Sequence, residues 1–211
     1  MKFGIVVAAV FLCGGCTMYR QLEITEIAPD AVELNVAEPP PNRLVLDDHV
    51  LNWARVDHES GQMTTGSIPL TGEFAAGAFV VVWMDSSYNG PPVPQDYVTE
   101  SGQSVPGIKV QAGALPEWKD GDSGAYSLSG DHQRGEWTDR VADLVKFGPA
   151  PRPPLDGAFR EDGSLNDARP QTGISISRRW NDDGTAPIDT DSESDFQLKP
   201  TSLGGPTPQQ Q

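Results

Sequence analysis

The feature that most constrains this chain is a succession of short segments in which apolar and polar residues alternate, with glycine and proline between them. Residues 22–27 alternate strictly, residues 31–36 do so less cleanly, and three prolines at 39–41 end the pattern. A period of two is typical of half-buried β-strands. Further strands are expected at residues 43–46, 50–56, 68–70, 78–84, 125–128, 141–147 and 174–177. Many short strands separated by turn residues predict an all-β sandwich or barrel.

The balance of residue types is compatible with a packed core. The 211 residues include 22 Gly and 19 Pro, a high share that stays below the level typical of disordered chains. Five Trp, seven Phe and four Tyr can fill a core, and the length fits one large domain or two small ones. Residues 78–84 are the most apolar segment after the N-terminus and predict a strand buried on both faces. The expected core residues are Trp53, Phe79, Val81, Trp83, Leu144, Phe147, Ile174 and Ile176.

Two long segments, residues 85–118 and 149–172, interrupt the strand pattern with prolines and glycines. Loops of this length are uncommon in compact domains and are usually functional or mobile. The first contains Tyr88, Tyr97 and Trp118. Tyr and Trp are frequent anchors of protein interfaces, which makes these three residues candidates for partner binding. The sequence is equally compatible with a loop that lies against its own sandwich.

The first 16 residues have the layout of an export signal. Lys2 supplies a positive charge, residues 5–12 are apolar, and the small residues Gly14 and Gly15 precede Cys16. The apolar run is much shorter than the roughly 18 residues that a membrane span needs. An ordinary cleaved signal peptide and an uncleaved apolar start are the alternatives.

This segment resembles the bacterial lipoprotein signal, in which a cysteine is acylated and the chain is cut just before it. The resemblance implies a signal peptide at residues 1–15, lipidation of Cys16 and a tether at residues 16–21. The departure is Cys13, where the family usually has Leu. The residue directly after Cys16 is Thr17 and not Asp. By resemblance to envelope lipoproteins of bacteria with two membranes, this implies that the protein lies at the outer membrane. Two acyl chains attach a protein stably where one chain is marginal.

The charge balance argues against nucleic acid as a partner. Thirty acids against fifteen bases give a formal charge of −15, which becomes −16 when Lys2 is removed with the signal. Residues 56–108 contain no Lys or Arg at all. Because phosphate contacts supply most of the affinity for nucleic acids, such a chain is not expected to bind them. Cys13 and Cys16 are the two cysteines, so no disulfide framework is expected further along the chain.

Arg178 and Arg179 form one short basic stretch. They precede Trp180, and could in principle contact phosphate. Residues 131–179 carry eight bases and eight acids, so the surroundings are balanced. The interpretation preferred here is a pair at a strand end, with the Trp packed nearby.

The order of these segments resembles the lamin-tail domain, an immunoglobulin-like β-sandwich. Residues 22–27 (LEITEI) are similar to its opening strand and residues 31–35 (AVELN) to its second. Further similar segments are residues 44–53, 74–82, 121–128, 139–148, 173–178 and 189–208. The departures are the insertion at 85–118 and Asn52, which stands where the family has Gly.

The resemblance implies one lamin-tail-like sandwich with long loop insertions over residues 22–198, followed by a polar tail at residues 199–211. In the family, such domains often accompany secreted hydrolases and are thought to localise them. The resemblance therefore implies a non-catalytic module whose partner is an envelope or extracellular protein.

Catalytic motifs are not found. His49, His58 and His132 are separated by 9 and 74 residues, and no two of them have the spacing of a helical metal-ligand pair. The chain lacks a nucleophile elbow, a Walker loop, a dinucleotide fingerprint and an H-E-x-x-H motif. We therefore expect a protein that is not an enzyme, with a secreted hydrolase of unrecognised site as an alternative.

The C-terminal acids are the main candidate metal site. Asp47, Asp48 and His49 could also bind a metal, but three polar residues in a row more often make a turn. Asp189, Asp191, Glu193 and Asp195 alternate as oxygen ligands do in calcium loops. Ser194 stands at the position where an EF-hand requires Gly. A calcium-dependent surface adhesin is therefore the second functional hypothesis, and no other cofactor is expected. The preferred interpretation is a solvated acidic loop whose carboxylates cap turns, with the following Phe returning to the core.

Overall fold

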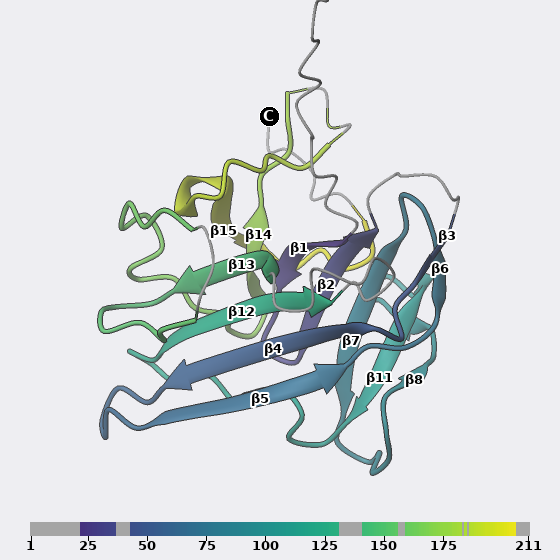
Figure 1. The fold of residues 1–211 in the computed structure, drawn as a ribbon, viewed down its shortest axis with the longest axis horizontal. Coiled ribbons are helices and arrows are strands. Elements are labelled where there is room, and N and C mark those ends of the chain that lie inside the picture. The colour runs from purple at the N-terminus through teal and green to yellow at the C-terminus, as the bar shows by residue number, and fades with distance from the viewer. Residues whose placement is uncertain are drawn as a thin grey trace, which may run out of the picture.

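Two β-sheets packed face to face form the molecule in a computed structural model, which describes residues 22–36, 43–130, 141–155, 159–182, 184 and 186–205 (Figure 1). The larger sheet has, in spatial order, the strands β15 (Phe196–Pro200), β14 (Ile174–Arg178), β1 (Leu22–Ile27), β2 (Ala31–Val36), β7 (Phe79–Asp85), β11 (Gly107–Gln111) and β8 (Val93–Pro94). The smaller sheet has the order β13 (Val141–Phe147), β12 (Ser123–Gly130), β4 (His49–Val56) and β5 (Met63–Pro69). The prediction of an all-β sandwich is confirmed, while its lamin-tail type stays a prediction.

Smaller elements complete the fold. Two-stranded pairs are formed by β3 (Arg43–Val45) with β6 (Glu73–Ala75), and by β9 (Tyr97–Val98) with β10 (Ser104–Val105). A single 3-10 turn, η1 (Glu193–Asp195), precedes β15. Within the described ranges, no helix is long and apolar enough to cross a membrane. The expected signal peptide, Cys16 and the tether lie outside the described residues, as do His132 and residues 206–211.

The interior strand β7 is buried on both faces over residues 80–82, as its sequence predicts. Val80, Val81 and Val82 are all fully buried. Because successive side chains of a strand point to opposite faces, Val80 and Val82 enter the core between the sheets. Val81 instead joins a second, smaller cluster on the outer face of the larger sheet, together with Val105 and Leu203.

The core between the sheets differs in part from the predicted set. Phe147 and Ile176 belong to it, and Trp53 packs at its margin. Phe79 and Trp83 lie on the same strand face as Val81 and are half-buried. Their rings pack outside the main core, against other aromatic side chains. Because side chains alternate between the two faces of β7, its apolar residues are shared between the main core and the outer face, although the sequence shows one continuous apolar run.

The prediction that residues 85–118 form one long irregular connection is wrong in part. The segment contains β8 to β11, and β11 runs parallel to β7 in the larger sheet, with Ile108 beside Val82. Parallel neighbours need a long crossover, and here the β9–β10 pair and its flanking turns supply it. The described residues of the second loop, 149–172, form no strand.

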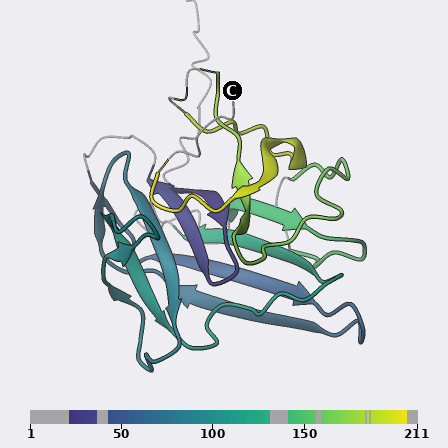
Figure 2. The same cartoon turned by 180° about the vertical axis from the view of Figure 1, so that it is seen from behind.

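β5 is longer than predicted, and β15 is a strand that the sequence pattern did not predict. β5 starts at Met63, whereas only residues 68–70 were predicted, and it is the edge strand that its proline implies. At the C-terminus, β15 reaches Pro200 and Leu203 packs against the larger sheet. The folded part therefore continues past residue 198. In Figure 2 the yellow C-terminal segment crosses the purple β1–β2 pair.

Candidate functional site

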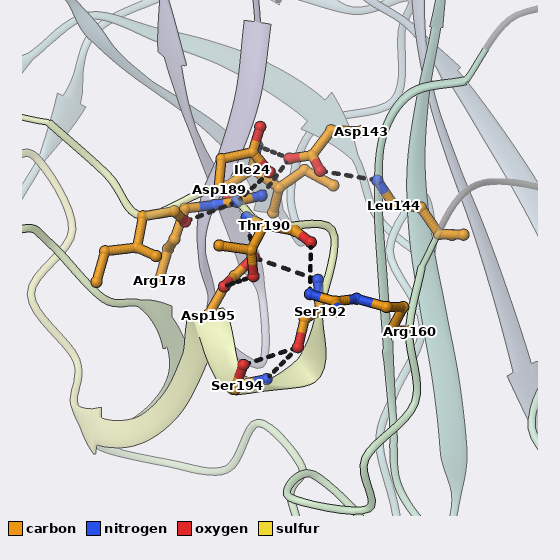
Figure 3. Close-up of polar contacts among 11 residues, drawn as sticks. Ile24, Asp143, Leu144, Arg160, Arg178, Asp189, Thr190, Ser192, Ser194 and Asp195 are labelled. Carbon is orange, nitrogen blue, oxygen red and sulfur yellow. Dashed lines mark hydrogen bonds and ion pairs between the residues drawn. The ribbon is translucent and has the colours of Figure 1, made fainter.

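A buried ion pair joins the two sheets at one open side of the sandwich. Arg178 of β14 donates to Oδ2 of Asp143 on β13 over 2.6 Å, and both side chains are almost wholly buried (Figure 3). The same oxygen accepts the backbone N–H of Ile24 at 2.7 Å. Arg178 Nε donates to the carbonyl of Ile24 at 2.9 Å. Ile24 lies where the register between β1 and β2 shifts, so the two side chains bond both of its polar backbone groups.

The charge of Arg178 is held by surrounding carboxylates. Burial by itself would lower the pKa of Arg178, but Asp143, Glu23 and Asp189 outweigh it and raise that pKa above its ordinary value. Asp189 Oδ1 accepts a hydrogen bond from Arg178 at 3.2 Å. Asp189, the first of the four predicted calcium ligands, is therefore a hydrogen-bond partner of the Arg178 guanidinium.

The other three predicted ligands, Asp191, Glu193 and Asp195, lie in one turn, and the carboxylate of Asp195 accepts the hydrogen bonds that hold this turn. This carboxylate accepts from the Thr190 N–H at 2.7 Å, the Thr190 hydroxyl at 2.6 Å and the Ser192 N–H at 3.2 Å. Ser192 caps η1 in return by accepting from the Ser194 N–H, which completes a capping box. Asp191 adopts a left-handed backbone conformation with φ of 55°. Figure 3 shows these contacts converging on the turn.

Glu193 is fully buried and belongs to a separate network. It forms an ion pair with Arg152 and accepts the backbone N–H of Leu165 at 3.1 Å. Arg152 also donates to the carbonyl of Gly148 at 2.8 Å. Glu193 therefore ties the turn before β15 to the loop that follows β13.

The structure does not bring the predicted calcium ligands together. Asp189, Glu193 and Asp195 have different protein donors. In the part of the chain that is described, no three His, Cys, Asp or Glu side chains lie where they could hold a metal ion. The expected turn-capping role is confirmed for Asp195, and Phe196 is buried as expected. The expectation of a solvated loop is wrong, since Glu193 and Asp195 are buried.

The predicted partner-binding aromatics all pack against the sandwich itself. Tyr88 donates its hydroxyl to the carbonyl of Pro91 at 2.7 Å. The ring of Tyr97 lies 5.9 Å from that of Trp83. Trp118 makes edge contacts with core rings at 5.0 and 6.0 Å. Each of the three rings is half-buried and has a different neighbour, so they form no common surface cluster.

The two described histidines, His49 and His58, lie near opposite ends of β4. His49 begins β4 and is buried, and the backbone N–H of His58 donates to Asp122 at 3.0 Å. Asp122 also holds Arg55. The contacts of Asp122 hold the turn that follows β4.

Sequence reasoning missed the arginines that complete these networks. Arg178 and its partner Asp143 are 35 residues apart, and Arg152 and Glu193 are 41 apart. The available signal was a base or acid inside a strand that is otherwise apolar, as at Asp143. Chemically, these networks can fix segments and neutralise charge. A scan against protein-family models finds no matching family, and a search of curated proteins finds no matching protein.

Proposed function

We propose that this chain is a lipid-anchored protein of the bacterial cell envelope that displays a non-catalytic β-sandwich as a binding or scaffolding module. The observation that carries the proposal is the N-terminal segment. Lys2, the apolar run at 5–12, and Gly15 directly before Cys16 have the layout of a lipoprotein signal, from which Cys13 is the departure. Thr17 after the anchor supports placement in the outer membrane.

The sandwich supports the scaffolding half of the proposal. Its strands at residues 22–27 and 31–36 cover the two segments with which the proposed lamin-tail resemblance begins. Buried ion pairs at Asp143 and Glu193 tie the C-terminal segments to the sheets. Loops held in this way keep one shape, which is what a display module needs to bind without an ordering cost. The partner proposed for such a module is an envelope or extracellular protein.

The intact mass of the protein in the membrane fraction tests the anchor. The expected product begins at Cys16 and carries added acyl mass. Cys16→Ala removes the acceptor thiol and should yield neither the cut nor the acyl mass. Cys13→Leu is the matched control, because it changes a cysteine in the removed segment to the residue usual in the lipoprotein signal.

Each outcome decides the proposal. Acylated mature protein in the wild type and in Cys13→Leu, but not in Cys16→Ala, supports it. A soluble product cut elsewhere, or the same uncut chain in wild type and Cys16→Ala, overturns it.

A further inference from the structure

A hollow of about 430 Å³ lies along β15, the edge strand of the larger sheet, and is lined by residues of both faces of that strand. Phe196 and Arg178 are paired across β14 and β15 and both are buried. Alternation then places their neighbours Gln197 and Arg179 on the opposite, outer face. Lys199, two residues further along β15, shares that face and also lines the hollow.

The hollow is lined by two cations, Arg179 and Lys199, for which no partner is found among the described residues. Arg179 and Lys199 form no side-chain hydrogen bond or ion pair within the described ranges. Every other Lys or Arg described there is bonded to a carboxylate or, in one case, to a backbone carbonyl. These are Arg43, Arg55, Lys109, Lys119, Lys146, Arg152, Arg160, Arg169 and Arg178. In a chain with twice as many acids as bases, two neighbouring unpaired cations are a specific feature.

The two cations also act on each other. Partial burial, together with the charge of Arg179, lowers the pKa of Lys199, although the charge of Glu26 opposes this shift. Glu26 itself is buried and accepts two hydrogen bonds from Ser202, at 2.8 Å each. An anion placed between Arg179 and Lys199 would relieve their repulsion and accept charge-assisted hydrogen bonds from both.

An aromatic ring completes the hollow. Trp180 lines it, and its ring lies 5.7 Å from that of Phe79. Backbone contacts fix the turn that carries it, since Trp180 bridges to Pro187 and the Ile188 N–H donates to the carbonyl of Arg179 at 2.8 Å. The apolar C–H face of a sugar ring packs favourably on a flat indole of this kind.

We propose that this hollow binds an acidic saccharide, with a sugar ring on Trp180 and its carboxylate or phosphate between Arg179 and Lys199. Gln197 and Asp182 also line the hollow and offer hydrogen-bond groups to the sugar hydroxyls. A neutral sugar would leave both cations unpaired, and a bare anion would leave the apolar lining exposed. The inference is independent of the lipid anchor, because binding is measured on purified protein.

Calorimetry on the full chain, purified in detergent, tests the inference with three probes. Trigalacturonic acid supplies rings and carboxylates, galactotriose supplies neutral rings, and sodium phosphate supplies the anion alone. The acidic trimer should bind, and the other two should bind about tenfold more weakly or not at all. Arg179→Gln and Lys199→Gln should each weaken binding of the acidic trimer by about tenfold, and Trp180→Leu by a similar factor.

Arg43→Gln is the matched control, since it removes one positive charge from an exposed position on β3. Unchanged binding in this variant supports a local site. The inference is overturned if the wild type does not bind the acidic trimer. It is equally overturned if phosphate or galactotriose binds as tightly as the acidic trimer, or if Arg43→Gln weakens binding as much as Arg179→Gln. A failure here would leave the mass test of the anchor unaffected.

Discussion

Asp143 and Arg178 hold two charges out of water, and their partners explain why this is tolerated. The carboxylate accepts from a guanidinium and a backbone N–H, while the guanidinium also reaches the carbonyls of Ile24 and Ile188. Burying an ion is costly unless its hydrogen-bonding groups are satisfied in this way. The pair therefore specifies how the two sheets meet, because any other arrangement leaves an uncompensated charge inside.

Removing one member of this pair should be strongly destabilising. Arg178→Met keeps much of the side-chain volume but leaves Asp143 and two carbonyls without their donor, and we expect a loss of about 3–5 kcal/mol. Arg43→Met provides the comparison, because the Arg43–Glu73 pair is exposed and should contribute less than about 1 kcal/mol. Unfolding in urea, followed by far-UV circular dichroism, measures both. Equal losses in the two variants would contradict the role given to burial.

Glu33 makes the stability depend on pH. Burial raises its pKa to about 8 from an ordinary value of 4.5, and the neighbouring Glu26 adds to this against hydrogen bonds from Thr25, Gly204 and Gly205. Because the folded state keeps a proton that the unfolded chain releases, stability should fall as pH rises from 4.5 to about 8. Above that window the contribution of Glu33 should level off.

Glu33→Gln isolates this effect. The amide carries no charge at any pH, so the variant should gain on the wild type as pH rises, by up to about 1.4 kcal/mol per pH unit within the window. Urea unfolding at pH 5, 6.5 and 8 gives the difference directly. Glu73→Gln, at an exposed carboxylate, serves as the control. A difference between wild type and Glu33→Gln that stays constant with pH would show that Glu33 is ionised in the folded protein.

Strand β5 contains a glycine, Gly66, at a position where a side chain would not fit. Gly66 pairs with Trp53 of β4, and a Cβ at Gly66 would overlap the indole ring. That ring also donates to the carbonyl of Ala114 at 2.8 Å. The glycine thus lets the edge strand pass beneath a ring that is fixed from the other side.

Gly66→Ala should therefore cost about 1–3 kcal/mol, since the indole must move and its hydrogen bond must lengthen. Gly205→Ala is the matched change, because a Cβ there meets nothing within 4 Å and no left-handed backbone is required. Thermal unfolding with tryptophan fluorescence reports on both. A neutral Gly66→Ala would mean that Trp53 can leave its place without loss.

The elements that could be predicted are those with a clear hydrophobic pattern, either alternation or a continuous apolar run. β1 and β2 have the bounds that alternation gives, and β7 differs by one residue at each end. β5 begins with residues that are mostly exposed, Met63 to Ser67, so alternation carries no signal there. β11 is short and follows a proline, and its strand character depends on pairing with β7, which is distant in sequence. The turn at η1 was expected to face solvent because the buried arginines that neutralise it lie elsewhere in the chain.

At the scale of the whole molecule, the sequence predicts layers but not their order. Hydrophobic alternation says that each strand has an inner face, and any sandwich satisfies that. The parallel β7–β11 pair depends on a crossover, and the position of β1 between β14 and β2 depends on contacts across most of the chain. The cationic hollow is also a property of this scale, because Arg179 and Lys199 come to line one hollow only through the β14–β15 pairing.

Net charge is the last property of the whole molecule that has a measurable consequence. With 30 acids and 15 bases, the folded state concentrates like charges, and their repulsion should weaken it at low ionic strength. Salt also weakens exposed ion pairs such as Lys119–Asp57, but each of these contributes less than about 1 kcal/mol. The buried pairs are screened far less. Because acids outnumber bases two to one, we expect repulsion to be the larger of the two salt-sensitive effects, so that added salt stabilises the protein.

Between 0.01 and 1 M NaCl the screening length falls from about 30 Å to about 3 Å, so most of the repulsion between surface charges should vanish. If the gain is on the order of 1 kcal/mol, the melting temperature should rise by about 2–4 °C. Choline chloride at equal concentration separates screening from sodium binding, since screening raises the melting temperature in both salts. A melting temperature that falls with both salts would mean that the surface ion pairs outweigh the excess of acids.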